Sequence, residues 1–267
     1  MKHKIAISID SHLLEKIDSL SKTSNRSHVI ESLLIKTLKQ KKINNALVLA
    51  GGRGAKLRPI TYEIPKPIIP VKGKPVLKWQ SDILRKSGIN NIFVAVSTDV
   101  EKIKKEVGNN LCFIEEKTPN GTGGAILLAK KHLQNEDFLV SYCDTVYNKY
   151  PNLNNMFDFH IEQKPVATML LMPTKNKMQG IAKLSGNKIT EFNEKPKNIN
   201  FGLISAGFFI FSPEIFDFLK SNCSMENDVF PLLASKGKLA GYVSDGEFFD
   251  IGTYQGYENA IKNWDGY

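Results

Sequence analysis

The sequence predicts an α/β protein with a Rossmann-like, mostly parallel mixed sheet and helices on both faces, preceded by a small N-terminal module. Two observations support this fold class. From residue 46 onward, short apolar runs alternate with amphipathic segments, an order that produces parallel strands joined by crossover helices. Nearer the C-terminus, strand-like runs follow one another directly, which is typical of antiparallel additions to a sheet. The 267 residues suffice for one large core and a small appendage.

The positive charge of the chain is unevenly distributed. The formal net charge is +9, and residues 1–43 carry nine Lys or Arg against four Asp or Glu, which leaves only +4 for the remainder. Such an asymmetry favours an anionic partner for the N-terminal segment. Lysine-rich helix faces are also common where a helix is merely solvated, so charge alone leaves both interpretations open.

Cysteine and histidine usage argues against a disulfide framework and a zinc site. The three cysteines, Cys112, Cys143 and Cys223, are far apart and lack CxxC spacing, and the five histidines form no HxxxH or HxH pair. The charged start MKHKIAISID has no apolar stretch of the signal-peptide kind, and no run of about eighteen apolar residues occurs. We therefore expect a cytoplasmic protein that does not contact a membrane.

The N-terminal segment predicts a strand followed by two helices. Ile5, Ile7 and Ile9 alternate with smaller or polar residues, as in a half-buried strand. Asp10 or Ser11 can cap the first helix and Ser27 the second. The apolar positions at helical spacing are Leu13, Leu14, Ile17 and Leu20 in the first helix, and Ile30, Leu33, Leu34, Thr37 and Leu38 in the second.

This order, with ISID leading into the first helix and NRSHVIE opening the second, resembles the ribbon-helix-helix family over residues 3–40. In that family, strands from two chains pair and enter the major groove of DNA. The resemblance would make Lys4, Ala6 and Ser8 the base-facing residues, with phosphate near Ser27. We expect residues 1–43 to form a homodimerisation module, and DNA binding remains a second possible role for it. Residues 44–267 then form the second domain.

The elements of this second domain follow in alternating order. Strands are predicted at 46–50, 91–96, 111–116 and 138–144, and helices at 75–88, 100–107 and 124–133. Further strands are predicted at 166–172, 180–186, 188–192 and 204–211. In open parallel sheets, ligands bind at the C-terminal ends of the strands, so the residues at those ends are the first candidates for a site.

A glycine-rich loop follows the first strand of this domain. Without side chains, Gly51, Gly52 and Gly54 allow backbone N–H groups to approach a polyphosphate. Lys56, Arg58 and Lys66 supply positive charge nearby. The loop matches neither common nucleotide motif, because Leu57 replaces the last glycine of GxGxxG and Pro75 follows Lys74 where a P-loop has Ser or Thr.

From about residue 44 to the C-terminus, the sequence resembles the sugar-1-phosphate nucleotidyltransferases, on the stretch LVLAGGRGAKLRPITYEIPKPIIPVKGKPVL. The resemblance implies a fold of the nucleotide-diphospho-sugar transferase type. It also implies nucleotide binding by Ala50, Gly51, Gly52, Gly54, Lys56 and Lys66. The family loop is usually GGxGTRL, so Ala55 replaces a hydroxyl residue and Lys56 an arginine. Lysine offers a point charge where arginine offers a bidentate fork.

Later motifs match the family in its order, and their roles are what the resemblance implies. The segment GTGGAI places Gly121 and Thr122 against the nucleobase. Glu194 and Lys195 of EFNEKP, with Gly207 of GFFIF, would bind the sugar and its phosphate. Asp144 of LVSYCDT and Asp250 of FFDIGT would hold Mg²⁺, a cation suited to a few carboxylates plus phosphate oxygens and water. Lys56, Lys66 and Asp144 would be the catalytic residues.

The expected reaction joins a nucleoside triphosphate to a sugar 1-phosphate with release of pyrophosphate. GTGGAI, and a chain that ends soon after FFDIGTYQGYENA, are most similar to heptose and mannose 1-phosphate guanylyltransferases, which favours GTP. Two alternatives remain open. One is a DNA-binding regulator that senses a sugar nucleotide, and the other is a cytidylyltransferase acting on a phosphocholine-like acceptor.

Overall fold

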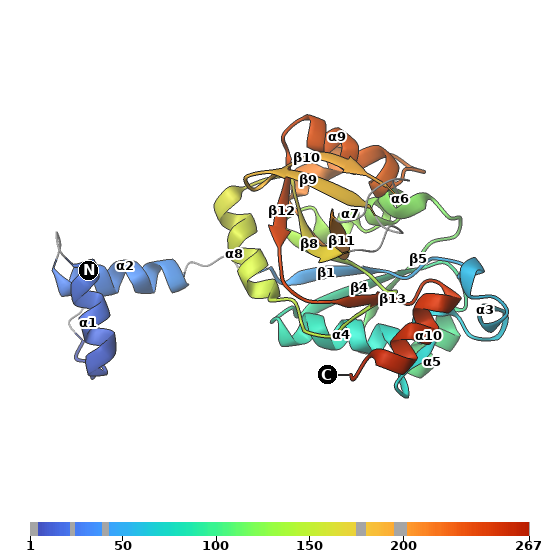
Figure 1. Ribbon diagram of the computed structural model, residues 1–267, viewed down its shortest axis with the longest axis horizontal. Coiled ribbons are helices and arrows are strands. Elements are labelled where there is room, and N and C mark those ends of the chain that lie inside the picture. The colour runs from blue at the N-terminus through green and yellow to red at the C-terminus, as the bar shows by residue number, and fades with distance from the viewer. Residues whose placement is uncertain (1–4, 22–24, 39–42, 175–179, 195–201, 267) are drawn as a thin grey trace. The chain divides into compact units, whose positions relative to one another are not determined.

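The computed structural model describes residues 5–21, 25–38, 43–174, 180–194 and 202–266, and divides the chain into two compact units. Unit 1 spans residues 1–42 and unit 2 spans residues 43–267. Figure 1 shows the elements of each unit. Within the described residues, no helix is both long and apolar enough to cross a membrane.

Unit 1 contains helices α1 (Ser11–Leu20) and α2 (Arg26–Leu38). The Asp10 side chain accepts a hydrogen bond from the backbone N–H of His12 and caps α1. Asn25 plays this part for α2, because its side chain accepts from His28 N at 2.8 Å. The prediction of Ser27 as the cap was therefore wrong, and Ser27 lies inside the first turn. Arg26 joins the helices through two hydrogen bonds to Asp18, at 2.5 and 2.6 Å.

The strand predicted around Ile5, Ile7 and Ile9 does not form in this single chain: residues 5–10 carry no strand pairing. A strand needs a neighbour to satisfy its backbone N–H and C=O groups, and the described part of one copy supplies none. Ile5 is 76% exposed and Ile7 55%. Among the described apolar side chains of the two helices, Ile17 and Val29 are buried, while others remain exposed: Leu13, Leu20, Leu33 and Leu34.

Unit 2 is built on a sheet that has nine strands among the described residues, in the order β5-β4-β1-β6-β11-β8-β12-β10-β9. Its first half is parallel: β1 pairs with β4 and β6, and β4 with β5. These strands span Asn45–Leu49 (β1), Asn91–Val96 (β4), Cys112–Glu115 (β5) and Phe138–Tyr142 (β6). The intervening helices are α4 (Val76–Lys86), α5 (Val100–Val107), α6 (Gly121–Leu128) and α7 (Lys130–Leu133). The predicted alternation of strands and helices is confirmed.

The second half of the sheet is largely antiparallel, as the consecutive strand-like runs predicted. Strand β11 runs antiparallel between β6 and β8, and β10 runs antiparallel to β9 and β12, while β12 is parallel to β8. The strands span Ala167–Thr174 (β8), Ile181–Ser185 (β9), Lys188–Asn193 (β10), Gly202–Phe211 (β11) and Leu239–Val243 (β12). Helix α8 (Leu153–Gln163) precedes β8, and η3 (Pro213–Asp217), η4 (Met225–Val229) and α9 (Phe230–Ser235) follow β11.

Each face of the sheet is covered by its own apolar core. One core joins the sheet to α4, α5, α8 and the C-terminal helix α10 (Tyr254–Asn263), and the other joins it to α6, α7, η3, η4 and α9. The predicted cover of helices on both faces is therefore confirmed, and Figure 1 shows α4, α5 and α10 on the opposite side of the sheet from α6, α7 and α9.

Smaller elements shape the loops beside the sheet. The segment after β1 forms η1 (Ala55–Leu57), α3 (Ile60–Glu63) and η2 (Lys66–Ile68), followed by a small hairpin of β2 (Pro70–Val71) and β3 (Lys74–Pro75). A second two-stranded sheet pairs β7 (Thr145–Tyr147) with β13 (Phe248–Asp250). Because β7 follows β6 directly, this pairing brings the C-terminal part of the chain to the end of a central parallel strand.

Trp264 anchors the segment after α10 to this region. Its fully buried ring packs edge-on against Trp79 on α4, with centroids 5.0 Å apart. The indole Nε1 donates to the carbonyl oxygen of Tyr147 on β7 at 2.8 Å. The anchor therefore supports the same small sheet that joins β7 to β13.

We expect Trp264→Ala to destabilise unit 2 by about 3–5 kcal/mol, because it leaves a large cavity and an unpaired buried carbonyl. Urea unfolding would measure the change. Tyr254→Ala, which removes an exposed aromatic ring from α10, is the matched control and should have a small effect. Similar losses for both substitutions would contradict the anchoring role.

Candidate functional site

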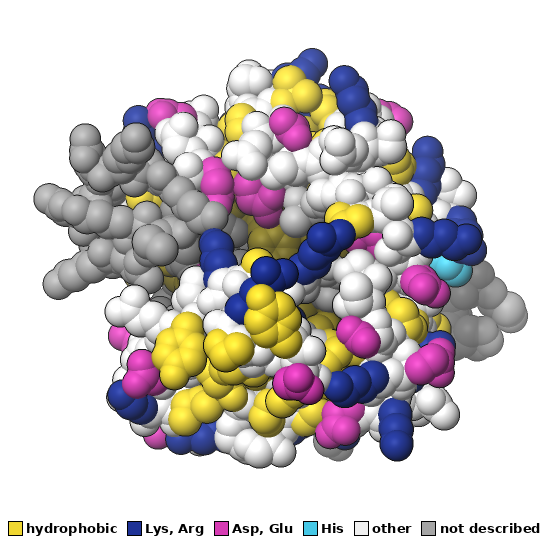
Figure 2. Space-filling model, turned by 90° about the vertical axis from the view of Figure 1, so that its right-hand side faces the viewer, with side chains coloured by type: hydrophobic (Ala, Val, Ile, Leu, Met, Phe, Trp, Pro, Cys, Tyr) yellow, Lys and Arg dark blue, Asp and Glu magenta, His cyan; other side chains and the backbone are white. Residues whose placement is uncertain are grey.

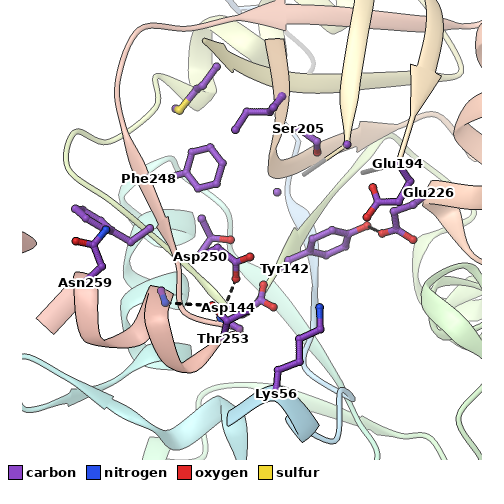
Figure 3. Close-up of a pocket in the computed structure, with 18 of the residues that line it drawn as sticks. Lys56, Tyr142, Asp144, Glu194, Ser205, Glu226, Phe248, Asp250, Thr253 and Asn259 are labelled. Carbon is purple, nitrogen blue, oxygen red and sulfur yellow. Dashed lines mark hydrogen bonds between the residues drawn. The ribbon is translucent and has the colours of Figure 1, made fainter. Parts of the chain in front are cut away.

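A cleft of about 1740 Å³ opens at the C-terminal ends of the parallel strands. Its lining comes from the loop after β1, the end of β6, strands β10 and β11, η4, and the β13–α10 corner. Figure 2 shows a face of the molecule that is hollowed near its centre, with lysine and arginine side chains crossing the hollow. Figure 3 shows the side chains that point into the cleft.

Two carboxylates meet at one end of this cleft. Asp144 comes two residues after the last residue of β6. The β7–β13 register sets Asp250 opposite Thr145, the residue that follows Asp144 in the chain. The backbone N–H of Ile251 donates to the carbonyl oxygen of Asp144 at 2.8 Å, which fixes the two segments against each other. Residues 106 positions apart in sequence thus become neighbours through one short strand pairing.

Lys66 compensates the charge of this carboxylate pair. Its Nζ lies 2.5 Å from Asp144 Oδ2, and the two side chains are only 16% and 28% exposed. Burial lowers the pKa of Lys66, but the Asp144 carboxylate outweighs burial and the net shift is upward. Burial raises the pKa of Asp144, but Lys66 outweighs it and the net shift is downward. Both groups therefore stay charged at neutral pH.

Asp250 has a different electrostatic environment. Its burial, followed by repulsion from the Asp144 carboxylate, raises the pKa of its carboxyl group. One stabilising hydrogen bond comes from Gly252 N, which donates to Asp250 Oδ1 at 2.7 Å. A carboxylate whose negative charge is not fully compensated by the protein is well suited to meet a cation.

The donor set fits Mg²⁺ held together with a phosphate ligand. Among the described residues, no cluster of three or more His, Cys, Asp or Glu side chains could enclose a metal by itself. Asp144 and Asp250 offer hard oxygen donors on one side of an open cleft, and Mg²⁺ is commonly bound by one or two carboxylates plus substrate phosphates and water. The arrangement thus suits a metal whose ligands come partly from the protein and partly from a bound phosphate, rather than a structural metal enclosed by protein ligands.

Gly252 is a site residue that the sequence analysis missed. A β-carbon there would lie 2.8 Å from Asp250 Oδ1, 2.9 Å from Asp144 Oδ2 and 3.2 Å from Lys66 Nζ. The three charged groups therefore converge on a point that only glycine leaves open. The only sequence signal was its position two residues after Asp250.

The glycine loop after β1 carries positive charge into the cleft. Gly54 has φ +62°, a left-handed conformation that glycine adopts without strain, and its carbonyl accepts from the Thr61 hydroxyl at 2.8 Å. Lys56 lines the cleft, and Figure 3 shows its side chain extending toward Asp144. Arg53 and Ala55 line it as well. In the described structure, the lining does not include Ala50, Gly51 or Gly52.

The GTGG segment makes a close contact with a distant part of the chain. The Thr122 hydroxyl donates to the Glu226 carboxylate at 2.8 Å and accepts from Met225 N at 2.8 Å. A β-carbon on Gly121 would lie 2.4 Å from the carbonyl oxygen of Cys223. Neither Gly121 nor Thr122 is among the described residues that line the cleft.

The rest of the cleft lining is mixed in character. It includes Glu194 and Gly207, and the aromatic rings of Phe192, Phe209 and Phe230 contribute apolar surface. Gly207 has φ +77°. Lys195, predicted to bind the acceptor phosphate, lies outside the described residues.

Two further residues of the cleft were not anticipated. Tyr142, at the end of β6, donates its hydroxyl hydrogen bond to Glu226 on η4, and both side chains line the cleft. Nothing in the spacing of these residues signals that they meet. The neighbouring Cys143 thiol is buried, and burial, followed by the Asp144 charge, raises its pKa, so it is not a nucleophile.

Comparison with known proteins bears on this cleft. A family profile described as Nucleotidyl transferase matches residues 45–265. The chain is 33% identical over 221 residues to mannose-1-phosphate guanyltransferase beta-B of Xenopus laevis, covering 78% of this chain and 61% of that protein. It is 32% identical over 220 residues to mannose-1-phosphate guanyltransferase of Saccharomyces cerevisiae, covering 77% and 60%. The chain thus spans about three-fifths of the length of these relatives.

Solved structures share the fold. HddC from Yersinia pseudotuberculosis superposes with a TM-score of 0.70 at 25% identity, covering 84% of this chain and 100% of that one. A second structure of that protein, complexed with GMP-PN, superposes with a TM-score of 0.69 over the same shares of the two chains. The predicted nucleotide-diphospho-sugar transferase fold of the large domain is confirmed, whereas the comparisons do not extend to the N-terminal module.

We expect Gly252→Ala to separate Asp144, Asp250 and Lys66 and to weaken Mn²⁺ binding in the presence of GTP by about 10²-fold, since small displacements of converging groups are costly. Electron paramagnetic resonance of free Mn²⁺ would measure the change. The thermal unfolding midpoint serves as the control for folding. Wild-type metal affinity in a folded variant would show that the convergence does not require glycine.

Proposed function

The chain belongs to the nucleotidyl transferase family, and we propose that it transfers a nucleotidyl group from a nucleoside triphosphate to a sugar 1-phosphate. The observation that carries this proposal is the convergence of Asp144, Asp250 and Lys66 in a cleft that Lys56 also enters. Paired carboxylates and lysines suit a reaction between polyanions. The comparisons support this reaction over a sensing regulator or a choline-type transferase.

In the proposed reaction, an oxygen of the sugar phosphate attacks the α-phosphorus of the triphosphate, and the bond to pyrophosphate breaks. Two anions must be brought together, so alignment and positive charge matter more than a protein nucleophile. Asp144 and Asp250 would hold Mg²⁺, which neutralises phosphate charge when bound. Lys56 and Lys66 would bind the triphosphate and steady the departing pyrophosphate, and Lys195 would hold the acceptor phosphate.

The base and sugar are the finer part of the proposal. We favour GTP with mannose or heptose 1-phosphate, which is supported by the relatives named mannose-1-phosphate guanyltransferase and by the GTGGAI segment. The cleft lining also includes Glu194, Gly207 and several phenylalanines, which suit a ring that carries hydroxyl groups on an apolar frame. Ala50, Gly51, Gly52, Gly54, Gly121 and Thr122 remain the proposed nucleotide contacts.

The departures at Ala55 and Lys56 bear on turnover. Lysine binds phosphate as a point charge rather than as a bidentate fork, so it constrains the triphosphate less than arginine would. Because Lys56 enters the cleft from the loop, its charge is still available to the triphosphate. We propose a slower enzyme of the same reaction class rather than one that has lost activity.

We propose that unit 1 pairs two copies of the chain. Its described part buries Ile17 and Val29 but exposes Ile5, Ile7 and Leu20 by more than half. A module of about forty residues has too little core to fold alone, and pairing the 5–9 segments of two copies would satisfy their backbone groups and cover these side chains. DNA is the second ligand to test for this unit, given its positive charge.

Pyrophosphate release with Mg²⁺ tests the reaction directly. The assay would pair each of four nucleoside triphosphates with mannose, glucose, glucosamine and heptose 1-phosphates. Release with GTP and one hexose or heptose 1-phosphate is the expected result. The proposal would be overturned in favour of a regulator if no pair gave pyrophosphate, while the folded protein bound a nucleotide sugar and bound duplex DNA in a salt-dependent manner.

Asp144→Asn and Asp250→Asn should each abolish Mg²⁺-dependent turnover, because each removes one charge from the proposed metal site while keeping the shape of the side chain. Initial rates of pyrophosphate release as a function of Mg²⁺ would measure the loss. Asp245→Asn, which changes an exposed aspartate paired with Lys149, is the matched control. Wild-type turnover in either test variant would remove that residue from the site.

Deletion of residues 1–42 should reduce the number of chains per particle in solution. Turnover per site should stay essentially unchanged, because the cleft is lined by residues of unit 2. Multi-angle light scattering would measure the mass. If the truncated protein kept as many chains per particle as the full-length protein, subunit pairing would have to be assigned to unit 2.

A further inference from the structure

Glu226 accepts hydrogen bonds from hydroxyl groups of two distant segments and of its own segment. It lies on η4, and its carboxylate accepts from Thr122 Oγ1 at 2.8 Å, from Ser224 Oγ at 2.7 Å and from the Tyr142 hydroxyl. Hydrogen bonds to an ionised acceptor are stronger than neutral ones. Figure 3 shows the Glu226 carboxylate at the tip of the Tyr142 ring, with Glu194 beside it.

The segment that carries Glu226 is docked tightly on the start of α6. The backbone N–H of Gly123 donates to the Cys223 carbonyl at 2.9 Å. A β-carbon at Gly123 would lie 2.4 Å from Cys223 Sγ, so a larger residue could not be accommodated without displacing the segment. Gly121 and Gly123 thus permit a close approach between the backbone at the start of α6 and the backbone around Cys223. This role does not depend on any ligand.

The three segments belong to different parts of the fold, and of the three only β6 and η4 contribute to the described lining of the cleft. Helix α6 follows β5 in the parallel half of the sheet. Strand β1 of the same half leads into the glycine loop. Strand β6 ends at Tyr142, two residues before Asp144. The segment η4 follows β11, in the antiparallel half that also supplies Glu194 and Gly207. One carboxylate therefore links a helix beside the parallel half of the sheet, and a segment that follows the antiparallel half, to the strand that leads to Asp144.

Tyr142 supplies one donor of this link. Its hydroxyl donates to the Glu226 carboxylate. Its ring also packs against Phe209 on β11, with centroids 5.2 Å apart, so that the link combines polar and apolar contact.

We propose that Glu226 is a positioning residue that, through Tyr142 and Thr122, holds the acceptor-binding half of the cleft in register with the nucleotide-binding half. This assignment of the two halves rests on the proposed function. Glu226 keeps the two subsites at the separation that a ligand spanning both requires. A ligand that occupies one subsite gains nothing from that separation.

The test compares ligands that span the cleft with one that does not. Isothermal titration would give the dissociation constants of GDP-mannose, which would occupy both halves, and of GMP, which would occupy one. We expect Tyr142→Phe and Glu226→Gln to weaken GDP-mannose by about tenfold or more. GMP binding should stay within about twofold, as for independent sites. The kcat for pyrophosphate release should fall while the KM for GTP is retained.

The double variant adds a second criterion. Because Tyr142 acts through its hydrogen bond to Glu226, the combined substitution should weaken GDP-mannose scarcely more than Glu226→Gln alone does. Tyr142→Phe keeps the buried ring and therefore keeps the test valid if Glu226→Gln folds poorly. Tyr150→Phe and Glu191→Gln are matched controls, since Tyr150 contacts Lys86 and Glu191 pairs with Lys183 outside the cleft.

Two outcomes would overturn the inference. Equal weakening of GMP and GDP-mannose would indicate a purely structural role, and unchanged binding of both would exclude any role in positioning. Failure of the proposed function is distinguishable from either outcome. It would appear as no pyrophosphate release by the wild-type protein. The inference fails instead if the variants leave the ratio of the dissociation constants for GDP-mannose and GMP unchanged.

Discussion

The electrostatic balance around Asp144 is the constraint on which the site depends. Two carboxylates held this close repel each other, and burial together with that repulsion raises the pKa of Asp250. Lys66 offsets part of the charge, and the β7–β13 pairing together with Trp264 holds the segments in place against it. The fold thus maintains a locally unfavourable arrangement that a cation and a polyphosphate would complete, and the remaining parts of the cleft are arranged around it.

Much of the large domain could be predicted from the sequence because local patterns determine it. Alternation of apolar runs and amphipathic segments specified strands and helices from β1 to β6, and the consecutive runs near the C-terminus specified the antiparallel half. The N-terminal prediction was less successful. The 5–9 segment has the periodicity of a strand but no partner in one chain, and Asn25 rather than Ser27 caps α2, since both residue types are favourable caps and only geometry chooses between them.

For the site, motifs identified the residues that stand at strand ends, and the structure brings Lys56, Lys66, Asp144, Glu194, Gly207 and Asp250 to one cleft. Tyr142, Glu226 and Gly252 could not be found in this way. Tyr142 and Glu226 meet across 84 residues of sequence, and Gly252 matters only because three charged groups surround it. Such relations depend on the register of distant strands, which one sequence does not reveal.

The unequal burial of the cysteines has a practical consequence. Cys112 at the start of β5 is exposed, while Cys143 and Cys223 are buried. A thiol-reactive dye applied to the native protein would attach at Cys112, on an edge strand of the sheet, and leave the cleft unmodified. The chain therefore comes with a single natural attachment point, from which fluorescence could follow events in the cleft without any engineered substitution.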